Sequence, residues 1–449
     1  MDQKRISFFL FLLFFSFVNA QVYPDQQHLI SGGDQLYLKI ESKENIYLNR
    51  EKDQIELVNG AKEGFFILQP ATFPEAFNRG LPSWNGSAQK DQRSSFKVQM
   101  RYKMSYGWSR WVTVGYWDQN IWPSYGDTTF QGGKISVDYL KLEEYIREYQ
   151  FKVIFTRENI SDISPSLHQL SFFVSDSQTT DQVNINEIVA DKPPEIFIPT
   201  NFVYQMDVDD EIGGEICSPS TVSMIIQSYD KEVDTYQFAL RTKDPYWNLF
   251  GVWPRVVQHA AEYGLKGTVT RYRTWSQAYE VLKNRGRIAM SIGPPLYSGH
   301  LVMLAGFDSS GNPIVHDPAK RSGYSKVYDK RDLSESWFNK GGISYTFYNN
   351  SGELSVEEEL FASGSLKLYP NPFHDSFKLA FEIKHNTGLQ LRIYNVQGKC
   401  VYTSEIRNLN SGDRNIIVVS SLSALPEGIY FLQILTDSGI IGKKILKLR

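Results

Sequence analysis

The hydrophobic pattern of this 449-residue chain changes twice, so no single kind of fold fits its whole length. Up to about Asp191, apolar and polar residues alternate in short runs such as 96–102 (FKVQMRY), which is the period of a strand with one buried face. From Val222 the apolar spacing becomes that of a helix, and beyond Gly364 the alternation returns. A chain of this length also exceeds one ordinary core, so we expect about three folded domains.

The first domain, residues 21–191, is predicted to be an N-terminal β-sandwich. Turn residues at 105–107 and 131–133 separate its strand-like runs, and an antiparallel sandwich is the natural packing for such strands. If its tryptophans are buried they form core, which is the favoured interpretation; if exposed, they would suit a glycan, cell-wall or peptide ligand. Five of the nine tryptophans fall here, namely Trp84, Trp108, Trp111, Trp117 and Trp122.

The second domain, residues 192–348, begins where Pro193 and Pro194 interrupt regular structure. Periodicity predicts a helix directly after Cys217 and further helices over 254–263 and 275–283. Strands are expected next, as listed here: 288–292, 301–307 and 313–315, with a turn at 308–312. Helices followed by a hairpin-rich segment predict an α+β domain.

The candidate catalytic residues lie in this second domain. Cys217 stands at the head of a predicted helix, where the helix N-terminus lowers the pKa of a thiol. His300 begins a strand 83 residues later, and Asp317 follows the next strand after 17 more. A thiol, an imidazole that takes its proton and a carboxylate that orients the imidazole make a nucleophilic device. The sequence therefore predicts Cys217, His300 and Asp317 as catalytic residues, against the alternative of a buried structural thiol.

Two further residues are candidates for this site. His316 is adjacent to Asp317, but side chains of successive strand residues point to opposite faces, so both cannot face Cys217; the pleat favours His300 as the base. Gln205 precedes Cys217 by twelve residues and is a candidate to donate its amide to an oxyanion beside the Cys217 N–H, or is a plain linker residue.

Other chemistries lack their motifs. The chain has no Gly-x-Ser-x-Gly, His-Glu-x-x-His, Gly-x-x-x-x-Gly-Lys or Cys-x-x-Cys. The acidic run 207–211 lacks the ligand spacing and central glycine of a calcium loop, so a solvated charge run is favoured. We expect neither a metal nor a cofactor.

The two ends predict export. Residues 1–20 carry Lys4 and Arg5, an apolar run and a small-residue site at 18–20, the pattern of a signal peptide cleaved before Gln21; an uncleaved anchor is the alternative. The mature chain should contain no transmembrane segment. A disulfide between the two cysteines, Cys217 and Cys400, is the less favoured alternative to free thiols because the two fall in different predicted domains.

Residues 349–364, glutamate-rich and ending in Ser363-Gly364, are predicted to be a linker. Residues 365–449 alternate again and predict a small all-β sandwich. This tail holds 11 basic and 6 acidic side chains, whereas the chain as a whole has 47 and 50, so the body is acidic and is not expected to bind nucleic acid.

The second domain resembles the papain-like cysteine peptidases related to the leader peptidases of bacteriocin exporters that cut after a double glycine. The matching residues are Gln205, Cys217-Ser218-Pro219, Gly299-His300, Gly306-Phe307-Asp308 and Asp317-Pro318-Ala319. The resemblance implies Cys217 as nucleophile, His300 as general base and acid, Asp317 as its orienting carboxylate and Gln205 in the oxyanion hole. Many members have glycine where this chain has Ser218, which leaves cleavage specificity open.

The flanking domains carry their own resemblances. The segments 82–85 (PSWN), 107–111 (GWSRW) and 137–140 (VDYL) are similar to the β-sandwich that precedes such peptidase domains in secreted bacterial proteins. The segments 368–373 (LYPNPF), 393–399 (IYNVQGK), 428–431 (GIYF) and 443–447 (KKILK) resemble the C-terminal sorting domain of the type IX secretion system of Bacteroidetes. That implies contact with the secretion machinery, passage across the outer membrane, and usually removal of the tail at the cell surface.

Together these observations predict a multidomain fold, with a central α+β papain-like cysteine peptidase domain between an N-terminal β-sandwich and a small C-terminal all-β sandwich. The expected function is hydrolysis of a peptide or protein substrate, at the cell surface or after secretion, through a covalent acyl-enzyme. Two alternatives stay open. One is a catalytically silent binding protein that uses the tryptophan-rich sandwich, and the other is an amidase acting on peptidoglycan.

Overall fold

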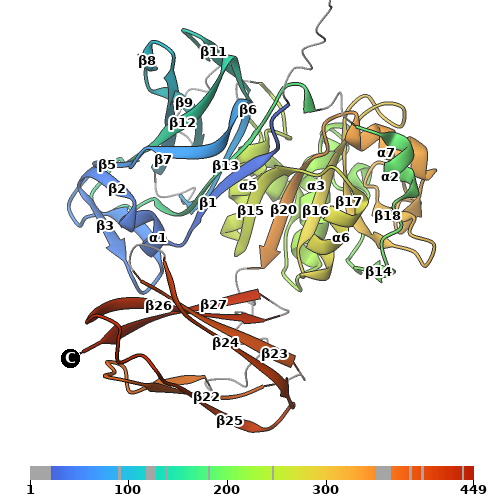
Figure 1. The fold of residues 1–449 in the computed structure, drawn as a ribbon. Coiled ribbons are helices and arrows are strands. Elements are labelled where there is room, and N and C mark those ends of the chain that lie inside the picture. Colours follow the sequence, from blue (N-terminus) through green and yellow to red (C-terminus); the bar gives the residue numbers. More distant parts are fainter. Residues whose placement is uncertain are drawn as a thin grey trace, which may run out of the picture. The chain divides into compact units, whose positions relative to one another are not determined.

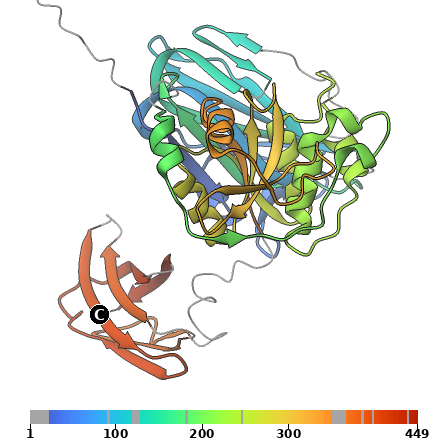
Figure 2. The ribbon, with the colours of Figure 1, turned by 90° about the vertical axis from the view of Figure 1, so that its right-hand side faces the viewer.

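The structure is a computed structural model, and it divides the chain into two compact units, residues 1–349 and 350–449. It describes residues 22–88, 93–117, 128–137, 139–179, 183–244, 247–349, 366–383, 387–395, 399–436 and 439–448. The predicted signal peptide, and the predicted linker except for its first residue, Asn349, therefore lie outside the described residues. Figures 1 and 2 show the chain from two sides.

The first half of unit 1 is an antiparallel β-structure (Figure 1). Its main path runs β10-β11-β12-β6-β13-β4-β3, and the long strand β12 continues past β6 to pair with β5 and β7. The elements are β1 (Gln26–Ser31), α1 (Gly33–Leu38), β2 (Ile40–Glu44), β3 (Ile46–Asn49), β4 (Gln54–Leu57), β5 (Glu63–Leu68), β6 (Ala71–Ser87), β7 (Ser94–Met104), β8 (Gly107–Trp108), β9 (Val112–Trp117), β10 (Thr128–Phe130), β11 (Gly133–Ser136), β12 (Tyr139–Arg157) and β13 (Ser166–Ser175).

The tryptophans of this half divide between core and surface. Trp84 and Trp117 are buried, and a Cβ at Gly115 would lie 2.0 Å from the Trp84 ring, so the core tolerates only glycine there. Trp108 and Trp111 are half-buried and hold the Arg101 guanidinium between them, 4.7 and 4.8 Å from their ring centroids. The first pair is therefore core, as the favoured interpretation had it, whereas the second pair is only partly covered; Trp122 lies outside the described residues.

The second half of unit 1 combines helices with a seven-stranded antiparallel sheet of order β15-β20-β16-β17-β18-β19, to which β14 adds beside β17. Figure 1 shows α3 and α6 against this sheet. The elements are α2 (Ile185–Ala190), β14 (Ile196–Phe197), α3 (Cys217–Gln227), α4 (Thr235–Thr242), α5 (Trp253–Glu262), β15 (Leu265–Arg271), α6 (Trp275–Lys283), β16 (Arg287–Ile292), β17 (His300–Phe307), β18 (Pro313–His316), β19 (Lys326–Val327), α7 (Lys330–Phe338) and β20 (Ile343–Asn349), with short 3-10 turns at η3 (Gln205–Asp207) and η4 (Gly213–Glu215).

Amide side chains of the first half of unit 1 form hydrogen bonds with the backbone of the second half. Asn85 on β6 pairs with Gly267 on β15: its Oδ1 accepts from the Gly267 N–H at 2.9 Å and its Nδ2 donates to the Gly267 carbonyl at 3.1 Å. Gln169 Nε2 donates to the same carbonyl at 2.8 Å, and all three residues are buried or close-packed. The two halves also share apolar core, since Leu81 and Phe173 belong to the cluster of the second half.

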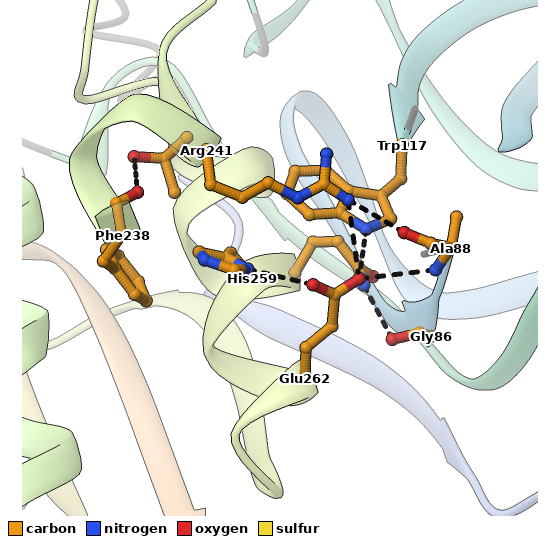
Figure 3. A network of polar contacts seen from close by, with 9 residues as sticks. Gly86, Ala88, Trp117, Phe238, Arg241, His259 and Glu262 are labelled. Carbon is orange, nitrogen blue, oxygen red and sulfur yellow. Dashed lines mark hydrogen bonds and ion pairs between the residues drawn. The ribbon is translucent and has the colours of Figure 1, made fainter. Parts of the chain in front are cut away.

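A second link is a polar network around Glu262, the last residue of α5 (Figure 3). One Glu262 carboxylate oxygen accepts from the Trp117 indole N–H at 2.6 Å and from the Ala88 N–H at 3.3 Å, and the other contacts His259 Nδ1 at 3.0 Å. The Arg241 guanidinium stacks on the Trp117 ring and donates to the Ala88 carbonyl at 2.8 Å. The carboxylate therefore satisfies donors from both halves at once.

Replacing Glu262 by leucine is expected to destabilise unit 1 by about 3 kcal/mol. The substitution removes the carboxylate that lies 3.8 Å from the largely buried Arg241 guanidinium and accepts from the Trp117 indole N–H. The measurement is the midpoint of thermal unfolding, which should fall by several degrees. Glu280→Gln is the matched control, since Glu280 pairs with Lys283 on the exposed face of α6 and should cost about 0.5 kcal/mol or less. Equal effects of the two substitutions would contradict the role given to Glu262.

Unit 2 consists of two small antiparallel sheets, of order β21-β22-β25 and β24-β23-β26-β27. One apolar core draws on both sheets, with Leu379 from the first and Leu391 and Leu432 from the second. The strands are β21 (Lys367–Tyr369), β22 (Phe377–Glu382), β23 (Thr387–Asn395), β24 (Cys400–Leu409), β25 (Arg414–Val419), β26 (Gly428–Thr436) and β27 (Gly439–Lys447). The molecule is thus β-rich with few helices, as the alternating patterns predicted.

Candidate active site

Cys217 is the first residue of α3, and no side chain caps the end of this helix. The free N–H groups and the helix dipole at that end favour a negative charge on the sulfur. Pro219 fits the first turn because its missing N–H would have no helical partner there. The Thr221 hydroxyl donates to the Leu301 carbonyl at 3.0 Å, which fastens the start of α3 to the start of β17. Cys217 is therefore held next to His300.

His300 and Asp317 are brought together by the β17–β18 hairpin. The strands pair with Met303 opposite His316, and Asp317 follows directly after β18. His300 Nε2 lies 2.8 Å from Asp317 Oδ1, with the imidazole 5% exposed and the carboxylate fully buried. This contact leaves Nδ1 as the ring nitrogen free to face the thiol.

Asp317 accepts three further hydrogen bonds. Oδ2 accepts from the hydroxyls of Tyr297 at 2.6 Å and Tyr328 at 2.5 Å, and Oδ1 also accepts from the Ala319 N–H at 2.9 Å. The Tyr297 ring lies on the imidazole of His300, with 4.2 Å between the ring centroids. The two tyrosines were not predicted from the sequence. Only the position of Tyr297, three residues before His300, offered a signal.

Cys217, His300 and Asp317 shift each other's pKa values toward the charged forms. Burial alone would raise the pKa of Cys217, but the hydrogen bond and charge of His300, with the N–H groups of Leu301 and Ser218, bring it below the ordinary value. Burial likewise disfavours the His300 cation, yet Asp317 and Cys217 raise the pKa of His300 above its usual range. Burial opposes ionisation of Asp317 as well, and His300 and the two tyrosine hydroxyls still lower its pKa to about 2. Both shifts favour a thiolate beside an imidazolium.

His316 lies elsewhere. Its Nε2 is 3.3 Å from the Ile198 carbonyl and its Nδ1 accepts from the Ser325 N–H at 3.0 Å. Its ring stacks on Tyr324 with 4.5 Å between centroids. Both ring nitrogens are occupied away from Asp317, so the structure brings His300 and not His316 to the carboxylate.

Gln205 lies in the turn η3 and is buried. Its Nε2 donates to the Gly213 carbonyl at 2.7 Å, and its backbone N–H donates to the Pro318 carbonyl at 2.9 Å. The second bond ties Gln205 to the residue after Asp317. One of the two Nε2 hydrogens remains for another acceptor.

The remaining candidates are the acidic run and the pair of cysteines. The Asp207 carboxylate of the acidic run forms an exposed bidentate pair with Arg321, at 2.8 and 3.0 Å. Within the described ranges, no group of three or more His, Cys, Asp or Glu residues is arranged to hold a metal ion. Cys217 and Cys400 are both free thiols in the structure, and the disulfide between the two predicted domains stays the less favoured alternative.

Three family models match the chain. Residues 197–345 match the Peptidase_C39 like family, residues 42–175 match the peptidase C39 N-terminal domain, and residues 367–448 match the secretion system C-terminal sorting domain. The predicted combination of these three domains is thereby confirmed. The central match supports a protein of the cysteine peptidase kind.

The sorting domain places this chain among the proteins exported by the type IX secretion system, at the cell surface or outside the cell. It also supports an interaction with the secretion machinery, as the tail motifs predicted. Over the described segments, no helix has the length and apolar character needed to cross a membrane. No curated protein matches the chain at a significant level.

Solved structures give only partial likenesses. The structure of PorZ, a surface component of the type IX secretion system of Porphyromonas gingivalis, is matched at 12% identity and a TM-score of 0.16, over 33% of this chain and 21% of that one. A β-glucuronidase of Parabacteroides merdae is matched at 10% identity and a TM-score of 0.15, over 36% and 26%. A BSP domain of a biofilm-associated protein is matched at 10% and 0.18, over 91% and 52%. TM-scores this low carry no functional argument.

The electrostatics of the site predict the reactivity of Cys217. A free cysteine with a pKa near 8.5 is only about 0.3% thiolate at pH 6. Because the pKa of Cys217 is lowered, its thiolate persists as the pH falls below 8.5, and because the pKa of His300 is raised, the imidazolium persists above 6.5. At pH 6 we expect iodoacetamide to alkylate Cys217 at least about tenfold faster than free cysteine.

Mass spectrometry of the alkylated peptides over pH 4–10 measures this. Cys400, which is exposed on unit 2, serves as a reference in the same tube. Substitution His300→Ala should remove the low-pH reactivity. A Cys217 profile that follows free cysteine would contradict the ion pair.

Proposed function

We propose that the protein is a secreted cysteine peptidase that hydrolyses peptide bonds with Cys217 as nucleophile, His300 as base and acid, and Asp317 as the carboxylate that orients His300. The single observation that carries this proposal is the buried His300–Asp317 contact of 2.8 Å beside a thiol at a helix N-terminus. A helix that carries the cysteine, packed on an antiparallel sheet that carries the histidine and aspartate, supports a papain-like α+β domain over residues 192–348.

The first half of the reaction uses the ion pair. The Cys217 thiolate attacks the carbonyl carbon of the substrate, and the C=O electron pair moves to oxygen. The remaining Nε2 hydrogen of Gln205 and the Cys217 N–H would stabilise that oxyanion. His300 then gives its Nδ1 proton to the leaving nitrogen, the C–N bond breaks, and an acyl-enzyme remains on Cys217.

The second half restores the enzyme. His300, now neutral and held by Asp317, takes a proton from water at Nδ1 as the water oxygen attacks the thioester. The C–S bond breaks, the carboxylic acid product leaves, and the thiolate–imidazolium pair is regenerated. Throughout, the two tyrosine hydroxyls keep the Asp317 carboxylate oriented toward Nε2.

Around this domain we propose the boundaries expected from the sequence. Residues 1–20 act as the signal peptide, residues 21–191 as the N-terminal sandwich, residues 349–364 as a linker and residues 365–449 as the sorting domain removed at the surface. The sandwich is bonded to the peptidase half through Asn85 and Glu262, which supports a role within the enzyme. Within the sandwich, the stack of Trp108, Arg101 and Trp111 is the surface that would bind a glycan or cell-wall ligand.

The test incubates residues 21–449, with the sorting domain still attached, with a peptide library and, separately, with peptidoglycan fragments, and identifies the products by mass spectrometry. A portion blocked beforehand with iodoacetamide at pH 6 is the control. We expect peptide products only with the unblocked enzyme, and after an acid quench a Cys217 adduct with the mass of the acyl fragment that lies on the N-terminal side of the cleaved bond. Turnover of cell-wall fragments alone would favour the amidase, and turnover in neither assay the binding protein.

A further inference from the structure

A pocket of about 480 Å³ lies beside the site and is built from both halves of unit 1. Tyr139, from the start of β12, faces residues of the second half across it. Its lining includes Ser136, Val137, Tyr139, Gly251, Arg271 and Lys340.

Two observations connect this pocket to the nucleophile. A Cβ at Gly251 would lie 3.5 Å from the Cβ of Ser218, the residue after Cys217. On the opposite side, a Cβ at Gly299, the residue before His300, would lie 3.7 Å from Lys340 Nζ. The ammonium and the thiolate also act on each other, because the charge of Cys217 opposes the lowering of the Lys340 pKa by burial. The pocket is therefore next to the point where a substrate carbonyl would be attacked.

The pocket presents two cations whose hydrogen bonds go to neutral groups. Lys340 Nζ donates to the Ile292 carbonyl at 3.2 Å. Arg271 Nη2 donates to the Tyr139 hydroxyl at 2.8 Å, and its Nε has no acceptor. In the part of the chain that the structure describes, neither side chain forms an ion pair with a carboxylate. Two half-buried cations at a common pocket are suited to bind an anion, and a carboxylate matches the fork of an arginine.

We propose that this pocket, through Lys340 and Arg271, binds a carboxylate of the substrate and makes the enzyme selective for peptides that are acidic next to the cleaved bond. This inference rests on the proposed function and specifies its substrate class. A carboxylate can come from an aspartate or glutamate side chain or from the end of a peptide. Both sources share the chemistry that the pocket recognises.

The first experiment needs no substrate. It measures the rates at which iodoacetate and iodoacetamide alkylate Cys217, and takes the ratio, which cancels any change in the thiolate fraction. Lys340→Met is expected to lower the iodoacetate preference about threefold to tenfold, because one positive charge near the sulfur is lost. Lys340→Arg should preserve the preference even if it packs less well. Lys283→Met, an exposed lysine of α6, is the control and should leave the ratio unchanged.

The second experiment uses peptides that differ only in charge. Glutamate and glutamine are compared at each position around the cleaved bond, and a free C-terminus is compared with an amide. We expect kcat/KM to be at least about tenfold higher for one acidic member of a pair, and near equal for the pair with the double variant Arg271→Met and Lys340→Met. A preference for glutamate identifies a side-chain carboxylate, and a preference for the free terminus identifies a terminal one.

The outcomes separate the two proposals. If the wild type cleaves peptides but shows no charge preference, or if the preference survives in the double variant, the carboxylate pocket is overturned and the peptidase remains. If the wild type cleaves no peptide, the proposed function fails and this inference fails with it. An unchanged alkylation ratio in Lys340→Met would also overturn the pocket.

Discussion

Replacing Cys217 by alanine is expected to lower kcat/KM for peptide hydrolysis by at least about 10⁴-fold while the protein stays folded. The loss should be this large because the two described side chains that bond to or stack on His300, apart from Cys217, are poor nucleophiles. Asp317 is held by four hydrogen bonds, and Tyr297 presents its ring. The fold should tolerate the change because alanine is the best helix former and only one half-buried sulfur is removed from the end of α3.

The measurement is the initial rate of product formation from a peptide found in the library, with thermal unfolding recorded alongside. Cys400→Ala is the matched control, since it removes the other thiol, exposed on unit 2, and should leave the rate within about twofold. Hydrolysis by the Cys217→Ala protein at more than about 1% of the wild-type rate would show that another group carries the reaction.

Local patterns predicted the elements that position the site. The helix expected over 275–283 is found at those residues, because the Thr274 hydroxyl accepts from the Gln277 N–H at its start and Arg285 turns to a positive φ after its end. The hairpin that joins His300 to Asp317 also follows from local pattern, since two apolar runs flank a turn in which Asp308 accepts from Ser310 and Asn312.

What the sequence did not predict depends on residues distant along the chain. Tyr328 reaches Asp317 from the segment between β19 and α7, and nothing in its neighbours distinguishes it from a surface tyrosine. The helices α4 and α7 were also missed, although Asp234 and Asp329 cap them, because their apolar residues are few. The hydrogen bonds of Asn85 and Glu262 between the two halves of unit 1 correspond to no periodic pattern in the sequence.

Replacing Asp317 by asparagine is expected to lower kcat by about 10³- to 10⁴-fold with little loss of structure. The carboxylate accepts on both oxygens: from His300 Nε2–H on one side and from Tyr297 and Tyr328 on the other. An asparagine has one oxygen, so its NH₂ group must face either two hydroxyl donors or the imidazole. Facing the imidazole, it would favour the tautomer protonated at Nδ1, which cannot take a proton during attack by water.

The same substitution should move the reactivity of the thiol, which distinguishes orientation from simple structural damage. Without the carboxylate the imidazolium is less stable, so the pKa of His300 falls, and the low-pH alkylation of Cys217 by iodoacetamide should fall with it. Tyr328→Phe is the graded control: it removes one donor from Oδ2 but keeps the charge, and should reduce kcat by about tenfold or less. If Asp317→Asn kept both the rate and the low-pH alkylation of the wild type, His300 would need a different partner, and because the ring nitrogens of His316 are bonded elsewhere, the triad itself would have to be abandoned.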